Sequence, residues 1–364
     1  MAGVHHGASA SGRRGLPRRR KPVPTGTALP RRAPASCARR PAATRNCPAG
    51  RWTGCQTPRV RKADITTDLV EGLVASQFPQ WAHLPVTPVE VDGWDNTTFR
   101  LGSSMSVRLP SADAYVAQVD KEHRWLPVLA PRLPVPIPVP LARGEPGPAF
   151  PRPWSVYRWI DGDLLTADRV TDMKALASDV AGFLAALYAC EPTGPAPGPH
   201  SFSRGGPVGT WDDQTREQLS TLRDVIDTRA ALDVWESALE AHCDAPPVWV
   251  HGDVTGTNLL VHEGRLAGVI DFGCSAVGDP ACDLTISWTF FRGESRELFT
   301  SLVPVESSAW ARGRGWALWK ALMHLAADQA RPGQGQRFDR RVGWRLSAKD
   351  VVAEVIDDHR SGAS

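Results

Sequence analysis

The chain alternates between short apolar runs of strand length and longer segments in which apolar residues recur every three or four positions. The short runs predict strands at 89–91, 98–101, 105–109, 154–160, 248–250, 259–261 and 266–270. The longer segments predict helices at 119–129, 173–187 and 316–327, and the acid-rich stretch 211–240 is also expected to be helical. Together they predict an α+β fold.

The apolar run at 248–250 leads directly into the sequence His251-Gly252-Asp253. The next two runs, 259–261 and 266–270, are joined by four residues that include a glycine, which predicts a β-hairpin. Asn258 lies at the entrance of this hairpin and Asp271 at its exit. Because the two strands pair, we expect these side chains to meet at one end of the hairpin.

The order and spacing of Asp253, Asn258 and the triplet Asp271-Phe272-Gly273 indicate phosphoryl transfer. In kinase chemistry a carboxylate accepts the proton of the acceptor hydroxyl, while an amide oxygen and a second carboxylate hold Mg²⁺. The alternative is structural, with Asp253 capping a loop and Asp271 closing a turn. Four matched elements in the right order favour the catalytic interpretation.

These residues carry a resemblance to a known family. The sequence at 251–253 and the sequence Gly278-Asp279-Pro280-Ala281 are similar to motifs of the aminoglycoside phosphotransferase family, relatives of protein kinases that phosphorylate small molecules. The resemblance covers most of the chain after residue 63. It implies a protein-kinase-like two-lobed fold, with a small β-rich N-lobe at 63–160 and a larger, mainly helical C-lobe at 161–364.

The resemblance also implies roles for single residues. Asp253 would be the catalytic base, and Asn258 and Asp271 would be the Mg²⁺ ligands. Asp279 and Asp283 would be structural, although an approach of Asp279 to the substrate is the alternative. ATP and Mg²⁺ are therefore the expected cofactors.

A polar loop at 93–97 lies between the runs 89–91 and 98–101, where the family places its loop over the ATP phosphates. Asn96, Thr97 and Thr98 offer backbone and hydroxyl donors that would contact phosphate. The loop contains only one glycine, so it departs from the glycine-rich pattern of protein kinases. A polar hairpin turn would have the same sequence.

Arg108 stands where the family usually has its phosphate-binding lysine. Arginine can bind phosphate through two parallel hydrogen bonds, and its charge does not titrate away. Its expected partner is Glu122, on the helix at 119–129. Glu122 lies among Lys121, His123 and Arg124, so a solvated charged face is the alternative interpretation of this helix.

The run at 154–160 resembles the last strand of the N-lobe, which leads into the hinge between the lobes. Adenine would then hydrogen-bond to backbone groups near Arg158 and Ile160. A proline-rich segment at 133–153 precedes it and excludes a helix there. This segment could bind a proline-recognising partner, but its interleaved valines and isoleucine favour packing within the lobe.

The first 62 residues differ in composition from the rest. They contain fifteen Lys and Arg, eight Pro and no Asp or Glu, without apolar periodicity, which predicts disorder. Three interpretations stay open: a nucleic-acid-binding tail, a targeting peptide, and an over-long gene model with a natural start near Val60 or Lys62. The remaining 27 basic side chains face 39 acidic ones, so residues 63–364 carry a formal net charge of −12.

Seven cysteines occur without any C-x-x-C pair, which argues against a zinc site and favours a reducing, cytoplasmic location. No apolar run approaches the length needed to span a bilayer, so no membrane association is expected. Binding of nucleic acid is expected, if at all, only through the basic N-terminal tail.

These observations predict an ATP-dependent phosphotransferase whose acceptor is an aminoglycoside-type antibiotic or a related hydroxylated metabolite. The net charge of −12 favours a polycationic acceptor, although acidity is common in soluble proteins. Macrolides, sugars and amino alcohols are the alternative acceptors. A non-catalytic nucleotide-binding protein of the same fold is the alternative from another class. The sequence does not distinguish ATP from GTP.

Overall fold

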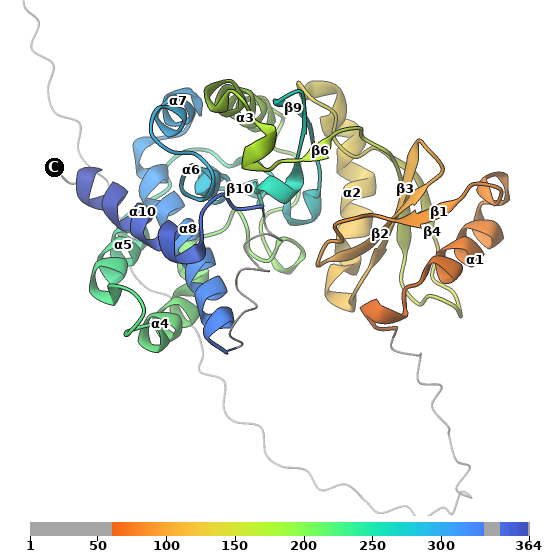
Figure 1. The fold of residues 1–364 in the computed structure, drawn as a ribbon, viewed down its shortest axis with the longest axis horizontal. Helices are drawn as coiled ribbons and strands as arrows, with labels where there is room; N and C mark the ends of the chain where they lie inside the picture. The colour runs from red at the N-terminus through yellow and green to blue at the C-terminus, as the bar shows by residue number, and fades with distance from the viewer. Residues whose placement is uncertain (1–59, 331–342, 363–364) are drawn as a thin grey trace, which may run out of the picture. The chain divides into compact units, whose positions relative to one another are not determined.

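Five antiparallel strands form the small lobe in the spatial order β1-β2-β3-β5-β4. This computed structural model describes residues 60–330 and 343–362. The strands are β1 (Val86–Pro88), β2 (Asn96–Leu101), β3 (Met105–Pro110), β4 (Pro140–Gly144) and β5 (Trp154–Arg158). Figure 1 shows α1 (Thr67–Gln77) and α2 (Val116–Leu129) on either side of this sheet.

Side-chain alternation along the strands gives the sheet two different faces. One face packs against α1 and forms a buried core with apolar side chains of β2, β3 and β5, among them Phe99, Leu101, Val107 and Val156. The opposite face carries Arg108 and Tyr157, and Tyr157 packs with residues of α2. The face of the sheet that carries Arg108 is therefore the one that packs toward α2.

The large lobe is mainly helical. Its helices are α3 (Met173–Tyr188), α4 (Asp212–Thr221), α5 (Thr228–Glu240), α6 (Ile286–Thr289), α7 (Glu294–Leu302), α8 (Ser307–Ala330) and α10 (Ala348–Gly362). Two small antiparallel sheets lie among them, one of β6 (Asp163–Leu164), β8 (Leu259–His262) and β9 (Arg265–Val269), the other of β7 (Val248–Val250) and β10 (Ala276–Gly278). The predicted division into a β-rich lobe and a helical lobe is confirmed.

Three expected elements differ from the structure. The strand expected at 89–91 lies at 86–88 instead, because Val86 is the buried residue that pairs opposite Leu101 whereas Val91 is exposed. The stretch 211–240 is two helices, and the second begins where the Asp227 carboxylate accepts a hydrogen bond from the Ala230 amide. The helix expected at 316–327 is longer and spans α8.

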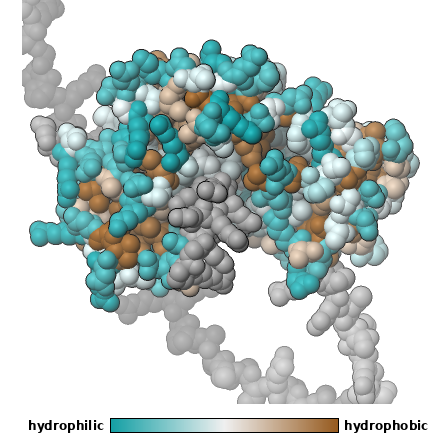
Figure 2. All heavy atoms as spheres, in the orientation of Figure 1, coloured by the Kyte–Doolittle hydropathy of each residue, from teal (hydrophilic) through white to brown (hydrophobic). Residues whose placement is uncertain are grey.

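The described surface is largely polar. On the face shown in Figure 2, hydrophilic residues cover most of the surface, and the hydrophobic areas are interrupted by them. No helix in residues 60–330 or 343–362 is long and apolar enough to cross a membrane. Residues 1–59, which make up nearly all of the expected basic tail, lie outside the described part of the chain.

Candidate active site

Strand β7 delivers the sequence His251-Gly252-Asp253 to the centre of the large lobe. Gly252 has a φ of +84°, and a Cβ atom there would lie 2.5 Å from the Cys274 carbonyl oxygen, so only glycine fits. The backbone amides of His251 and Gly252 donate to the carboxylate of Asp283 at 2.9 and 2.6 Å. Asp283 therefore fixes this loop from beneath, which agrees with the structural role expected for it.

Asp283 and Asp279 are both committed to structural contacts. Burial raises the pKa of the Asp283 carboxyl to about 6, despite the two amides that stabilise its charged form. Asp279 caps the turn that begins at Pro280 and pairs with the guanidinium of Arg312 at 2.6 and 3.2 Å.

The carboxylate of Asp253 is held on both of its oxygens. The side-chain nitrogen of Asn258 donates to Oδ2 at 3.1 Å and to the Asp253 carbonyl oxygen at 2.9 Å. Lys320, on α8, donates to Oδ1. Burial would raise the pKa of Asp253, but the charges of Lys320 and Arg204 outweigh it and lower the pKa to about 2. Asp253 is thus ionised at all ordinary pH values.

Asn258 and Asp271 lie at the same end of the β8–β9 hairpin, because the Ile270 amide donates to the Asn258 carbonyl oxygen at 2.9 Å. Asp271 adopts a left-handed conformation with a φ of +63°, which is unusual for a residue with a side chain and typical of functional sites. The side-chain nitrogen of Asn258 donates to Asp253, so its amide oxygen is the atom that could bind a cation.

The donor set at this end of the hairpin fits Mg²⁺. One carboxylate and one amide oxygen are hard ligands, and Mg²⁺ is commonly held by one or two protein oxygens, with phosphates and waters completing its shell. No group of three or more His, Cys, Asp or Glu side chains in residues 60–330 and 343–362 is arranged to hold a metal ion. With two protein oxygens to offer, the site suits a cation whose remaining ligands come from phosphate and water.

Arg108 lies across from the hairpin on β3. Its guanidinium donates to Asp271 at 3.0 Å and lies 3.8 Å from Glu122. Glu122 also accepts a hydrogen bond from the hydroxyl of Tyr157. Burial would lower the pKa of Arg108, but Asp271 and Glu122 raise it further above its usual value. The expected pair of Arg108 and Glu122 is present, and Asp271 is the nearer carboxylate.

Two residues near Arg108 were not expected at the site. Lys121 is buried on α2, and its ammonium donates to the carbonyl oxygens of Gly273 and Ser275 at 2.6 and 2.9 Å. Asp95 accepts a hydrogen bond from Gln118 at 3.0 Å, and burial, together with the charge of Asp271, raises its pKa to about 6. Since Lys121 and Glu122 are both buried, a solvated charged face is excluded for them.

The loop before β2 is closed by local hydrogen bonds. The Thr98 amide donates to Asp92 at 3.1 Å, and the Ser111 amide donates to the Asp95 carbonyl oxygen at 2.8 Å. Thr98 pairs opposite Arg108, so Thr98 and Asn96 lie on the same face of the sheet as that arginine. Thr97 lies on the opposite face, and its buried hydroxyl has no hydrogen-bond partner among the described residues.

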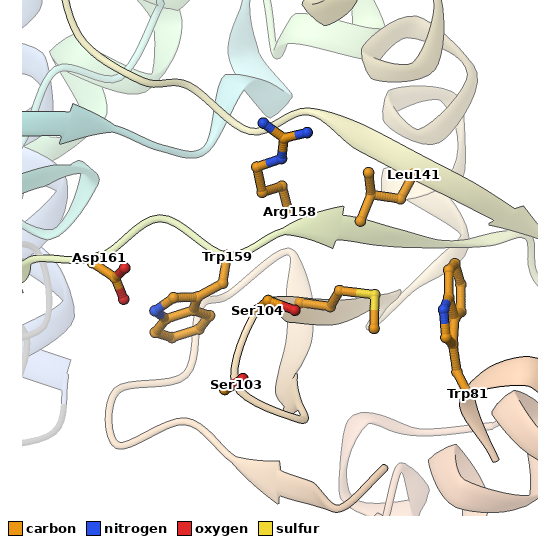
Figure 3. A pocket seen from close by; sticks show the side chains of 8 residues that line it. Trp81, Ser103, Ser104, Leu141, Arg158, Trp159 and Asp161 are labelled. Carbon is orange, nitrogen blue, oxygen red and sulfur yellow. The ribbon is translucent and has the colours of Figure 1, made fainter. Parts of the chain in front are cut away.

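The expected hinge follows β5. The Arg158 amide donates to the Val139 carbonyl oxygen at 3.0 Å and the Trp159 amide to the Ser104 carbonyl oxygen at 2.8 Å. A pocket of about 520 Å³ lies here. Figure 3 shows the side chains of Arg158 and Trp159 on opposite sides of the strand. Neither Asp253 nor Asp271 lines this pocket, so it is separate from the catalytic loop.

Comparisons with known proteins find a matching family model and solved structures of similar fold. The family model described as the phosphotransferase enzyme family matches residues 86–316. No curated protein matches the sequence. The GDP complex of wild-type aminoglycoside 2'-phosphotransferase-IIIa is 16% identical, with a TM-score of 0.59 over 81% of this chain and 100% of that one.

Two further solved structures are similar. The streptomycin–ATP complex of APH(2'')-IIa is 18% identical, with a TM-score of 0.50 over 79% of this chain and 98% of that one. Macrolide 2'-phosphotransferase MphH from Brachybacterium faecium is 20% identical, with a TM-score of 0.52 over 79% of this chain and 97% of that one. At these identities the likeness establishes the fold, and it confirms the predicted protein-kinase-like class.

Proposed function

Because this chain belongs to the phosphotransferase enzyme family, we propose that it transfers the γ-phosphate of ATP to a hydroxyl group of a small molecule. Phosphoryl transfer to an alcohol acceptor follows from the family and the fold. The observation that carries the proposal is the meeting of Asp253, Asn258 and Asp271 at one end of a rigid hairpin, opposite Arg108.

Asp253 is the proposed base. Lys320 and Asn258 fix the orientation of its carboxylate, and its side chain keeps about a third of its surface exposed, at 30%. As the acceptor oxygen bonds to the γ-phosphorus, the bond to the bridging oxygen breaks, ADP leaves, and the hydroxyl proton passes to Asp253. A pKa of about 2 makes Asp253 a weak base, so orientation of the hydroxyl is its larger contribution.

Asn258 and Asp271 are the proposed Mg²⁺ ligands. Mg²⁺ bound there would neutralise charge on the phosphate oxygens. Arg108 would bind phosphate on its outer side while Glu122 and Asp271 hold its guanidinium in place. Asn96 and Thr98 lie on the same face as Arg108 and are proposed phosphate contacts, whereas Thr97 could contribute only through its backbone.

Backbone groups near Arg158 and Ile160 are the proposed adenine contacts. The amides of Arg158 and Trp159 already donate within the small lobe, so the Arg158 carbonyl and the Ile160 amide are the groups we assign to adenine. Side chains at the hinge would then have little influence on nucleotide binding. A cytoplasmic location is proposed with this function, because ATP is plentiful there and Cys190, Cys243, Cys274 and Cys282 are free thiols.

The structural neighbours act on aminoglycosides and macrolides, which makes a hydroxylated natural product or metabolite the acceptor class to test first. The experiment measures the formation of ADP from Mg-ATP, or of GDP from Mg-GTP, by the purified protein with a panel of hydroxylated compounds. Acceptor-dependent ADP formation that vanishes without Mg²⁺ is expected. A protein that binds Mg-ATP but never releases ADP would be the non-catalytic nucleotide-binding alternative.

A further inference from the structure

The guanidinium of Arg204 lies beside the catalytic loop on a platform of indole rings. Its centre is 4.5 Å from the ring centroid of Trp319 and 5.3 Å from that of Trp316. Trp319 is fixed in turn, since its ring nitrogen donates to Gln214 at 2.7 Å and its ring stacks on Trp211 at 4.7 Å. The aromatic platform thus holds Arg204 in one orientation.

The backbone that carries Arg204 is strained. Phe202 and Ser203 both have positive φ values, +48° and +57°, which cost free energy in residues with side chains. The strain brings Arg204 against the catalytic loop, where a Cβ atom on Gly252 would lie 2.9 Å from the Cβ atom of Arg204. Backbone strain of this kind persists where the surrounding structure fixes it, and it clusters at functional sites.

Arg204 has no ion pair among residues 60–330 and 343–362. Its Nη1 is buried and has no hydrogen-bond partner within that part of the chain. Arg108 and Arg312 differ from it, because each is paired with at least two carboxylates. A buried and unpaired donor on a charged group is costly, which indicates that Arg204 is not held in place for an ion pair within the protein. Its other guanidinium nitrogens, which are not among the buried and unpaired atoms, are the ones that a ligand would contact.

Lys320 is a second cation near Asp253, and the charge of Arg204 also favours the ionised form of this carboxylate. The ammonium of Lys320 contacts Asp253 from α8, where Lys320 directly follows Trp319 and lies one turn beyond Trp316. Arg204 and Lys320 therefore both lie near Asp253, where the acceptor hydroxyl must lie, and Lys320 is already paired with its carboxylate. A cationic group beside Arg204 would meet repulsion, whereas an anionic group there would meet complementary charge.

We propose that Arg204 determines acceptor specificity by binding an anionic group, a carboxylate or a phosphate, on a hydroxylated acceptor whose hydroxyl faces Asp253. The inference rests on the proposed function. The planar guanidinium, whose central carbon lies 4.5 Å from the ring centroid of Trp319, can form two parallel hydrogen bonds to such a group. It predicts an acceptor unlike the cationic antibiotics, even though residues 63–364 carry a net charge of −12.

The test compares acceptors that share one skeleton and differ in charge. Glucose, gluconate, glucose 6-phosphate and glucosamine form one set, glycerol, glycerate and glycerol 3-phosphate a second, and kanamycin is the polycationic reference. ADP formation gives kcat/KM for each with saturating Mg-ATP. The thermal shift that each compound causes in the presence of Mg²⁺ and a non-hydrolysable ATP analogue gives binding without turnover. Carboxylates and phosphates are separate arms of each set.

The preferred compound should be an anionic member of its set. Arg204→Gln should lower its kcat/KM about ten- to a hundredfold through KM, with no change in the KM for ATP. Arg204→Lys should lose less, because the charge remains. Arg216→Gln removes the same charge from α4, where Arg216 pairs at the surface with Asp212 and with Glu236 of α5; it is the matched control and should leave the acceptor preference unchanged.

Three results would overturn the inference. The first is a preference for kanamycin or a neutral compound; the second is an equal loss for anionic and neutral acceptors in Arg204→Gln. The third is the absence of any thermal shift by the anionic compounds with the nucleotide site filled. Kanamycin-dependent ADP formation would refute this inference alone. Absence of ADP formation with every compound would refute the proposed function, and this inference with it.

Discussion

Replacing Lys320 with methionine tests how the site keeps Asp253 ionised. Lys320 donates to Asp253, whose pKa is about 2. Asp95 and Asp283 show what burial does to a carboxyl without a bonded cation, since both have a pKa of about 6. Arg204 remains in the variant, so we expect Lys320→Met to raise the pKa of Asp253 from about 2 toward the value of about 6 that burial gives Asp95 and Asp283. Each tenfold change in this acid dissociation constant corresponds to about 1.4 kcal/mol.

The assay is the pH dependence of kcat/KM for ADP formation between about pH 4 and 8. If Asp253 must be ionised, the wild-type profile should show no loss from this group in that range. Lys320→Met should instead lose activity as the pH falls below the raised pKa of Asp253, approaching a tenfold loss per pH unit. Lys320→Arg keeps the charge and should keep the wild-type profile.

Circular dichroism at each pH would show that the loss is not unfolding. An acid limb in Lys320→Met at the same pH as in the wild type would refute the reasoning. In that case either Lys320 does not set the pKa of Asp253, or the protonation state of Asp253 does not limit the reaction.

Three further predictions concern the nucleotide side of the site. Asp271→Ala should abolish the thermal stabilisation by Mg-ATP, because it removes the proposed carboxylate ligand; unchanged stabilisation would exclude Asp271 from the metal site. Arg108→Ala should raise the KM for ATP about tenfold or more, Arg108→Lys should raise it less, and the loss from adding Glu122→Gln should be smaller than additive. Wild-type kinetics in Arg108→Ala would mean that another cation binds the phosphates. Asp95 has a raised folded pKa of about 6, so its protonated form stabilises the protein below about pH 4, and about 2 to 3 kcal/mol is lost as the pH rises to 7. The free energy of unfolding, measured with denaturant at both pH values, should fall less between them in Asp95→Asn than in the wild type. An equal fall in the two proteins would contradict the assignment.

The parts of the site that could be predicted are those set by local sequence. Asp253, Asn258 and Asp271 follow from a strand, a loop and a hairpin, and the hairpin register alone brings the last two together. A local signal of the same kind is Asp227, which precedes an apolar stripe and marks a helix start within 211–240, although one continuous helix was expected there. The break there was missed because the acid-rich pattern continues on both sides of it.

The parts that could not be predicted depend on tertiary contacts. Lys121 contacts Gly273, 152 positions away, and Lys320 contacts Asp253, 67 positions away. Lys121 lies in a run of charged residues, and such a run predicts a solvent-exposed face unless the burial of its side chains is known. Lys320 did carry a signal, because it is a single cation inside the apolar stretch of α8, and buried charges are rarely left unpaired. The strand at 86–88 was misplaced because a three-residue strand has too few positions to define its alternation.

The most direct test of the central claim, that Asp253 serves a phosphotransferase, is single-turnover ADP formation by Asp253→Asn with Mg-ATP and the preferred acceptor. The substitution removes the carboxylate but keeps its shape. We predict that the variant binds Mg-ATP as tightly as the wild type while phosphoryl transfer falls by about a hundredfold or more. Transfer at a near-normal rate in Asp253→Asn, with Mg-ATP affinity unchanged, would contradict the account.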